Sequence, residues 1–401
     1  MCKDKKCPVC ATCNECPELS CPKGGSEKLY KPLMDAGSTA APYFDPKANG
    51  GMDFKVFVYD LPEKFHVGLK KEQKRCINDQ YGTEIRIHED LKHSKFRTKD
   101  PNEAEFFFVP IYGECHLYRE SHRLGKEGLA STNRFYREAL SIVKNEYPYW
   151  NQTQGRDHVF VFAGARGPHI FRDWKRNIKK SIFMTPEGDR SLSEQFNTWK
   201  DIVIPGLEND KPYWTGSLHN IHTKKSIFAF FKGTIHNKEG KSYSKGIRIH
   251  MEHHFKNETD VVFSEATRDC NRDCYRDKMS RSTFCLCPRG WSPWTLRAYQ
   301  AMMAGCIPVI IADEIEFPYE SRLDWSQMTV KIAEKDANNT IKILRTLTDE
   351  QIDAKRRMID KHWRKVAWQQ PSKPGDAFHT VMEELGTKRR FMKASSYTFW
   401  N

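Results

Sequence analysis

The sequence predicts an α/β protein built on parallel β-sheets, and three observations support this prediction. Short apolar runs alternate with segments of helical periodicity along most of the chain, as expected when helices connect parallel strands. Residues 284–311, FCLCPRGWSPWTLRAYQAMMAGCIPVII, combine a strand, a loop, a helix and a second strand without interruption. The length of 401 residues is sufficient for two domains with substantial cores.

Within this strand–helix–strand segment, each boundary has a local signal. The apolar runs 284–286 and 307–311 predict two strands, and the second is continuous enough to be buried on both faces. Ser292 is the predicted N-cap of the helix, and Pro293 occupies the first helical position. Gly305 ends the helix, because glycine readily adopts the left-handed conformation of a C-terminal cap.

The loop before this helix has the features of an anion site. Free N–H groups and the helix dipole point at any group bound there, and Gly290 and Ser292 lie in the loop. Arg289 and Arg297 flank it, which predicts a diphosphate site in a nucleotide-binding half of the protein. The alternative is an ordinary α/β crossover whose arginines are solvated.

The composition limits the classes of partner. The formal net charge is +13, which favours polyanionic partners such as an acidic polysaccharide, a nucleotide-sugar, a nucleic acid or an anionic membrane. The alternative is a basic surface that keeps the protein soluble. The sequence contains no RNA- or DNA-binding signature, so we expect no nucleic-acid partner.

Several long motifs resemble, in their order along the chain, those of the exostosin family of glycosyltransferases. The C-terminal signature is STFCLCPRGWSPWTLRAYQAMMAGCIPVIIADEIEFPYE. The similarity covers roughly residues 54–388. The other motifs are FVYDLP (57–62), FRTKDPNEAEFFFVP (96–110), YPYWNQTQGRDH (147–158), KDIVIP (200–205), FKGTI (231–235), YSKGIR (243–248) and DAF (376–378).

The resemblance implies a GT-B fold, in which two Rossmann-like domains face a cleft. We expect a Cys-rich stem and linker at 1–51 and an N-terminal Rossmann-like acceptor domain at 52–223. A C-terminal Rossmann-like domain that binds the nucleotide-sugar follows at 224–375. Residues 376–401 are expected to form a helix that packs back on the N-terminal domain.

The elements of both domains follow from the apolar pattern. In the first domain, a helix is expected around 134–145, with strands at 54–59, 105–111, 158–162, 182–184 and 202–204. In the second domain, a helix is expected at 246–255, with strands at 227–231 and 261–263 before the signature segment.

The resemblance also implies the reaction. We expect an inverting glycosyltransferase that moves a sugar from a UDP-sugar donor to a polysaccharide or glycoprotein glycan. Asp313 and Glu314 do not form a DxD metal motif, so we expect no essential metal or other cofactor. The alternative is a catalytically inactive glycan-binding or scaffolding partner with the same fold. Whether the protein forms homo- or hetero-oligomers is left open.

Further donor-site candidates come from the same resemblance. The family commonly places a carboxylate three residues after the signature arginine, where it would hold the ribose, but this chain has Gln300. Glu314 and Glu316 follow the strand at 307–311 and are the candidate substitutes, since ligands of open α/β sheets bind at this end of the strands. Lys232 is placed to meet the diphosphate from another strand, or else it caps that strand.

An inverting displacement needs one carboxylate or histidine near the acceptor hydroxyl. Asp157, His158 and His169 are the candidate bases, because they flank a strand of the first domain. The alternative for Asp157 and His158 is a structural pair that begins this strand.

The cysteines fall into two groups. Cys7, Cys10, Cys13 and Cys16 are spaced three apart in the stem, which suits either zinc or iron–sulfur ligation or, in an oxidising lumen, a disulfide-linked stem. A second group, in the C-terminal domain, predicts disulfides that include Cys270 with either Cys274 or Cys285; the group is Cys270, Cys274, Cys285, Cys287 and Cys306.

The resemblance places the protein in the Golgi lumen, where such enzymes are commonly anchored by a membrane span. No apolar run approaches the roughly 18 residues of a span. Either an anchor has been removed from this chain or the protein is naturally soluble. Sequons for N-glycosylation at Asn151, Asn257 and Asn338 are compatible with a lumenal location.

Overall fold

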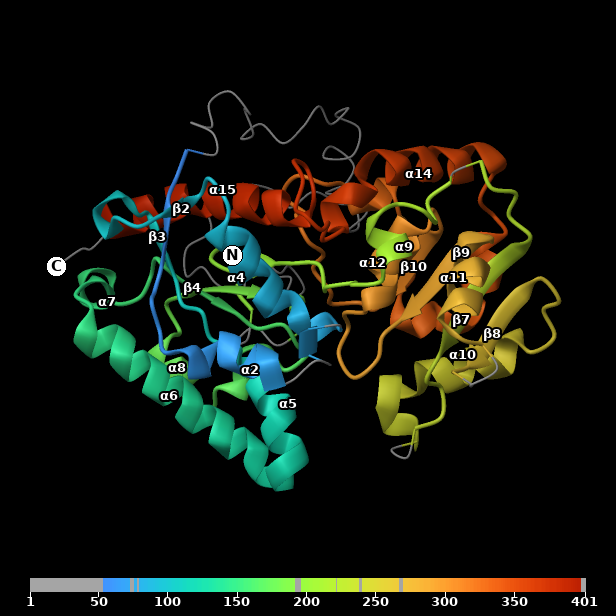
Figure 1. The fold of residues 1–401 in the computed structure, drawn as a ribbon. Coiled ribbons are helices and arrows are strands. Elements are labelled where there is room, and N and C mark those ends of the chain that lie inside the picture. The colour runs from blue at the N-terminus through green and yellow to red at the C-terminus, as the bar shows by residue number, and fades with distance from the viewer. Residues whose placement is uncertain are drawn as a thin grey trace, which may run out of the picture. The chain divides into compact units, whose positions relative to one another are not determined.

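The computed structural model describes residues 53–72, 76–77, 79–191, 196–220, 222–237, 240–266 and 270–397. The stem with its cysteine cluster, expected at 1–51, lies outside the described residues. From Met52 onward the chain forms one compact unit, and this unit contains two parallel sheets (Figure 1).

The first sheet has six strands in the order β2-β1-β3-β4-β5-β6, and every neighbouring pair is parallel. Its strands are short and mostly apolar, so their side chains fill the core on both faces. They are β1 (Val56–Val58), β2 (Arg97–Thr98), β3 (Phe106–Phe108), β4 (His158–Val161), β5 (Ile182–Thr185) and β6 (Ile202–Val203).

The second sheet has five strands in the order β11-β10-β9-β7-β8, again all parallel. The strands at its centre are continuous apolar runs, and every residue of β10 is buried. Its strands are β7 (Ile227–Gly233), β8 (Val261–Glu265), β9 (Ser282–Pro288), β10 (Ile307–Ile311) and β11 (Val330–Lys331). The two sheets are the two Rossmann-like halves of the expected GT-B fold.

Helices connect the strands and cover the sheets, as parallel topology requires. In the half that carries the first sheet they are α2 (Val67–Glu72), α4 (Thr83–Lys92), α5 (Gly113–Leu124), α6 (Gly128–Glu146), α7 (Tyr149–Thr153) and α8 (Trp174–Asn177), whereas the next helix, α9 (Lys211–Trp214), packs against α12 (Leu296–Met303) of the other half. In the remainder they are α10 (Ile247–Phe255), α11 (Arg272–Ser280), α12 (Leu296–Met303), α13 (Thr340–Leu344), α14 (Asp349–His362) and α15 (Ala377–Tyr397).

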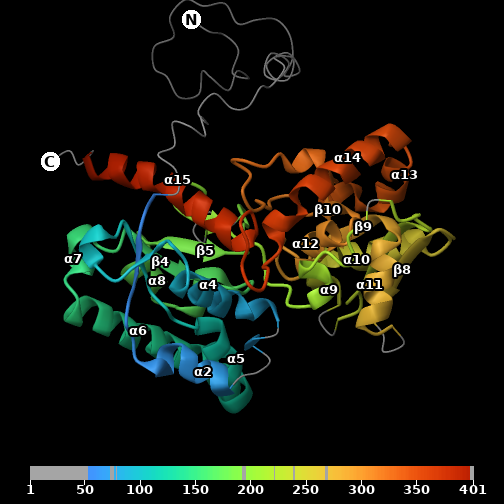
Figure 2. The same cartoon turned by 45° about the horizontal axis from the view of Figure 1, so that its top comes forward.

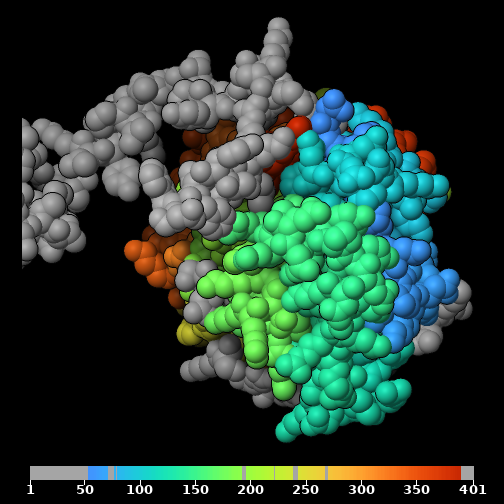
Figure 3. Space-filling view, turned by 90° about the vertical axis from the view of Figure 1, so that its left-hand side faces the viewer, coloured from blue at the N-terminus to red at the C-terminus, as the bar shows by residue number. Residues whose placement is uncertain are grey.

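Helices α6 and α15 lie on opposite sides of the first sheet in both ribbon views (Figures 1 and 2). The long α15 is the last helix of the chain, yet it contacts the half that carries the first sheet. Phe378 packs its ring against Phe96 at 6.3 Å, and the Lys388 ammonium donates to the Thr198 carbonyl at 2.6 Å. These two contacts join α15 to residues of the first half. Figure 3 shows the face made by that first half, coloured blue through green.

The expected strands and helices of both halves are confirmed, but the expected N-cap of α12 was wrong. Thr295, not Ser292, is the N-cap: its backbone is extended, and its hydroxyl accepts from the N–H of Arg297 at 3.4 Å. The intervening Pro293 and Trp294 are buried, so packing extends the loop by three residues beyond the first local signal. Gly305 follows α12 with a φ of +66°, as expected for a glycine that ends a helix.

Three disulfides join described cysteines, and one of them corrects an expectation. Cys270 pairs with Cys274, which was one of the two alternatives, while Cys76 pairs with Cys115. The pairing of Cys270 with Cys285 was wrong, because Cys285 pairs with Cys306. Strands β9 and β10 are parallel neighbours, which brings the Cα atoms of this pair to 5.9 Å, within disulfide reach.

Among the described residues, every helix is too short or too polar to cross a bilayer.

Candidate functional site

A cavity of about 540 Å³ opens at the carboxyl end of the second sheet. Ligands of open α/β sheets bind at this end of the strands. Two of its walls come from the signature helix α12 and the end of strand β7, and a third comes from the loop that follows β6. The lining side chains used below are Glu208, Lys232, Tyr275, Leu296, Arg297 and Gln300.

The environment of Arg297 is that of a residue that binds an anion. Its Nη2 donates to the Lys232 carbonyl at 3.1 Å, and its Nε donates to the Tyr275 hydroxyl at 3.2 Å. The guanidinium lies over the ring of Phe231, 4.4 Å from its centroid. Its Nη1 is buried and has no hydrogen-bond partner among the described residues, and no described carboxylate pairs with it. A partly buried cation held by neutral groups, with one donor unused, is suited to binding an anionic group in this cavity.

Lys232 contributes a second cation to the same cavity. It stands near the end of β7, is only 8% exposed, and lines the cavity beside Arg297. The structure therefore brings together two of the residues that the sequence proposed for the diphosphate.

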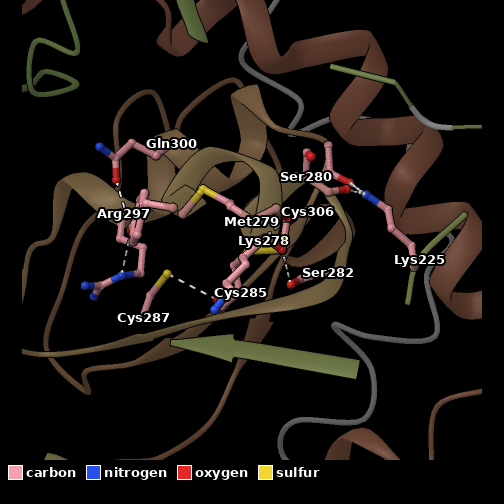
Figure 4. Close-up of a disulfide and its surroundings, with 12 residues drawn as sticks. Lys225, Lys278, Met279, Ser280, Ser282, Cys285, Cys287, Arg297, Gln300 and Cys306 are labelled. Atoms are coloured by element: carbon pink, nitrogen blue, oxygen red, sulfur yellow. Dashed lines mark hydrogen bonds between the residues drawn. A yellow bond between two sulfur atoms is a disulfide. The ribbon is translucent and has the colours of Figure 1, made fainter. Parts of the chain in front are cut away.

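Gln300 lies one helical turn after Arg297, and the two side chains extend from α12 in the same direction (Figure 4). Its Nε2 donates to the Glu208 carboxylate, and its Oε1 accepts from the Tyr275 hydroxyl at 3.4 Å. Burial raises the pKa of Glu208, while the hydrogen bond from Gln300 lowers it. The carboxylate missing from position 300 is thus supplied to the cavity by Glu208. Sequence reasoning missed Glu208; its only signal was its place just after the strand at 202–204.

Arg289 does not line this cavity. Its Nη1 forms an ion pair with Glu334 at 2.9 Å, and its backbone N–H donates to the Ile311 carbonyl. Its neighbour Gly290 donates its N–H to the Ser292 carbonyl, which closes the loop on itself. The Ser292 side chain borders a different cavity, so the structure separates this part of the loop from Arg297.

A buried arginine holds this loop in place. Arg248 donates to the Pro288 and Arg289 carbonyls, each at 3.0 Å, and to the Thr234 carbonyl at 2.8 Å. It also bonds the Tyr243 hydroxyl at 2.8 Å, and burial lowers its pKa to about 10. No role was predicted for Arg248, although it ends the YSKGIR motif that resembles the exostosin pattern.

Neither of the two acidic candidates after β10 lines the cavity that contains Arg297. Glu314 is exposed. Glu316 is buried, pairs with Arg190 at 2.8 Å, and accepts from the Thr198 hydroxyl at 2.7 Å. Arg190 and Thr198 belong to the loop between β5 and β6, so the contacts of Glu316 join the two halves.

This placement predicts the phenotype of Glu316→Ala. Loss of the Arg190 and Thr198 contacts should lower the free energy of unfolding by about 1–2 kcal/mol, because a partly buried ion pair and a hydrogen bond disappear. The affinity for UDP should stay within about 0.3 kcal/mol of the parent. Urea unfolding and calorimetric titration measure the two effects, and a large loss of UDP affinity would return Glu316 to the donor site.

The candidate bases lie apart from the cavity. His158 is fully buried, with Nε2 bonded to the Tyr59 hydroxyl and Nδ1 to the Asp157 carboxylate, both at 2.7 Å. Burial lowers the pKa of His158. Asp157 also accepts from the Thr153 hydroxyl at 2.6 Å, so this pair has the contacts of a structural pair. His169 is partly buried and packs edge-on against Trp174.

The comparisons with known proteins agree on one family. Residues 51–347 match the Exostosin GT47 domain. A probable glucuronosyltransferase of Oryza sativa subsp. japonica is 34% identical over 347 residues, which span 83% of this chain and 81% of that protein. A probable glucuronosyltransferase of Physcomitrium patens is 33% identical, over 83% and 75% of the two chains. A probable beta-1,4-xylosyltransferase of Arabidopsis thaliana is 32% identical, over 83% and 82%.

Proposed function

This chain belongs to the exostosin GT47 family and is a glycosyltransferase, and from this premise we propose that it moves a sugar from a UDP-sugar to a glycan acceptor. The acceptor is a polysaccharide or a glycoprotein glycan, and the configuration of the anomeric carbon is inverted. Relatives are named for the transfer of glucuronic acid and of xylose, so UDP-glucuronic acid and UDP-xylose are the first donors to test.

One observation carries the proposal: the partly buried guanidinium of Arg297, which lines the cavity at the carboxyl end of the second sheet. As the bond from the anomeric carbon to the diphosphate breaks, negative charge gathers on the leaving group. Arg297 has an unused donor nitrogen there, and Lys232 lies beside it. A cation already fixed by Tyr275 and Phe231 stabilises this charge without having to reorganise during the reaction.

The nucleoside is assigned to the same cavity. Glu208 supplies a carboxylate able to accept from the ribose hydroxyls, and Gln300 fixes its position by donating to it. With the cations of Arg297 and Lys232 lining this cavity, the proposed mechanism needs no divalent metal.

The Golgi lumen is the proposed location. Three disulfides among the described residues support it, because such bonds form and persist in oxidising compartments.

The proposal predicts UDP release that depends on the donor and increases with an acceptor. The purified protein would be incubated with UDP-glucuronic acid, UDP-xylose, UDP-galactose and UDP-N-acetylglucosamine, with and without xylo-oligosaccharides or glucuronate-bearing oligosaccharides. We expect one donor to dominate and its turnover to survive EDTA. If no donor yields UDP, the proposed donor class is wrong; if EDTA abolishes turnover and manganese restores it, the metal-independent mechanism is wrong.

A further inference from the structure

A second cavity, of about 590 Å³, borders the signature loop at Trp291 and Ser292. The half that carries the first sheet provides most of its wall, and the loop before α12 provides the rest. The lining residues used here are Tyr81, Glu114, Tyr118, Arg166, Trp291 and Ser292.

Glu114 is the unusual group in this wall. It lies in the first turn of α5 and is only 6% exposed. Its Oε1 is buried and has no hydrogen-bond partner among the residues that the structure describes. The carboxylate lies against the backbone of Gly164, where an added Cβ would come within 2.3 Å of Oε1. A buried carboxylate oxygen left without a partner is costly to a fold, which suggests that a substrate group completes its bonding.

Glu84 and Glu120, two other buried carboxylates in the same half, have partners, whereas both carboxylate oxygens of Glu187 are also buried without a hydrogen-bond partner among the described residues. Glu84 accepts from the backbone N–H groups of Glu114 and Cys115 at 3.2 and 3.0 Å. Glu120, two turns along α5, pairs with Arg119 and Arg123 at 2.9 and 3.0 Å. Glu84 thus holds the backbone at the start of α5 in place, while the Glu114 side chain is left to the cavity.

The second cavity and the donor cavity have no lining residue in common, but neighbouring positions along the chain line the two. Asp79 and Gln80 line the donor cavity, and the next residue, Tyr81, lines the second one. In the same way, Arg297 lines the donor cavity while Trp291, in the loop before the same helix, lines the second. Two continuous chain segments therefore border both cavities, as expected for subsites that hold the two reactants of one transfer.

The side chains around Glu114 suit a sugar. Trp291 is 58% exposed and offers an aromatic surface on which a pyranose ring can pack. Burial raises the pKa of Glu114 to about 7, and the nearby Arg166 opposes this rise. A carboxyl group that titrates near neutral pH is well matched to taking a proton from a hydroxyl group during attack.

We propose that this cavity is the acceptor subsite and that Glu114 is the general base of the transfer, an inference that rests on the proposed function. The acceptor hydroxyl gives its proton to the Glu114 carboxylate while its oxygen bonds to the anomeric carbon of the donor. The bond from that carbon to the β-phosphate oxygen breaks, and its electron pair leaves with UDP. Glu114 then releases the proton to water. Trp291 carries the acceptor sugar on its ring.

The test compares Glu114→Gln with Glu120→Gln, which makes the same change on the same helix outside the cavity. Acceptor-dependent UDP release would be measured with the donor that the parent uses best and with β-1,4-xylo-oligosaccharides and glucuronate-bearing oligosaccharides. We expect Glu114→Gln to lower kcat at least about 100-fold with unchanged UDP affinity, while Glu120→Gln stays within about threefold. Glu114→Asp should retain more activity than Glu114→Gln.

The dependence of kcat/KM on pH separates a catalytic role of Glu114 from a structural one, because a structural role would not change it. In the parent, kcat/KM should fall below about pH 7 as Glu114 becomes protonated, and this acid limb should disappear in Glu114→Gln. Three results overturn the assignment: a Glu114→Gln variant within threefold of the parent, a Glu114→Gln variant that also loses UDP binding, or an acid limb that persists in it. A parent that yields no UDP from any donor refutes instead the proposed function, and with it this role.

The remaining competitor is Glu187, which is 3% exposed and lies near Ser292. Burial raises its pKa to about 8, with the Ser292 hydroxyl opposing the rise. If Glu187→Gln abolishes turnover while Glu114→Gln retains it, Glu187 is the base and the assignment to Glu114 is wrong.

Discussion

Arg248→Leu is expected to lower the free energy of unfolding by about 3–5 kcal/mol and to abolish measurable UDP binding. The guanidinium is buried and donates to the carbonyls of Thr234, Pro288 and Arg289. Leucine fills part of the volume but leaves these three acceptors without their donor, and each unsatisfied buried group costs about 1–3 kcal/mol unless the loop opens to water. Urea unfolding and calorimetric titration with UDP measure the two losses.

Arg345→Leu is the matched control in the same half. Arg345 is half exposed, and its charge is paired with Glu258 and Asp260 at the surface. Such pairs contribute about 0–1 kcal/mol, so this variant should unfold close to the parent and bind UDP normally. If Arg248→Leu were no less stable than Arg345→Leu, Arg248 would not be the residue that supports the signature loop.

The parts of the fold that the sequence predicted are those with local signals. The apolar runs at 284–286 and 307–311 form strands of the second sheet, as expected for parallel strands that are buried on both faces. Gly305 ends its helix because of its own backbone freedom. The N-cap was misplaced at Ser292 because burial of Pro293 and Trp294, a tertiary effect, moves the start of the helix to the next available hydroxyl.

The candidate site likewise has residues that the sequence predicted and residues that it did not. Arg297, Lys232 and Gln300 were identified from one motif and one strand end, and they line one cavity. Glu208 and Glu114 come from segments far from that motif in the sequence, so no spacing could associate them with it.

The charge of a residue near a strand end did not predict whether that residue lines the donor cavity. Arg289 and Glu316 were candidates because they are charged residues near strand ends, yet each is held in an ion pair, with Glu334 and Arg190 respectively. Whether a charged side chain already has a partner is decided by the tertiary structure, and a single sequence does not contain that information.

The central claim is that Arg297 binds the diphosphate of the donor, and calorimetric titration of UDP into the parent and Arg297→Ala tests it most directly. Charge-assisted hydrogen bonds to a buried anion are worth about 1.5–3 kcal/mol, so the variant should bind UDP about 10- to 150-fold more weakly. Arg345→Ala, which removes a charge of the same sign from the surface of the same half, should bind UDP like the parent. Equal affinity for UDP in Arg297→Ala and the parent would contradict the assignment of the donor to this cavity.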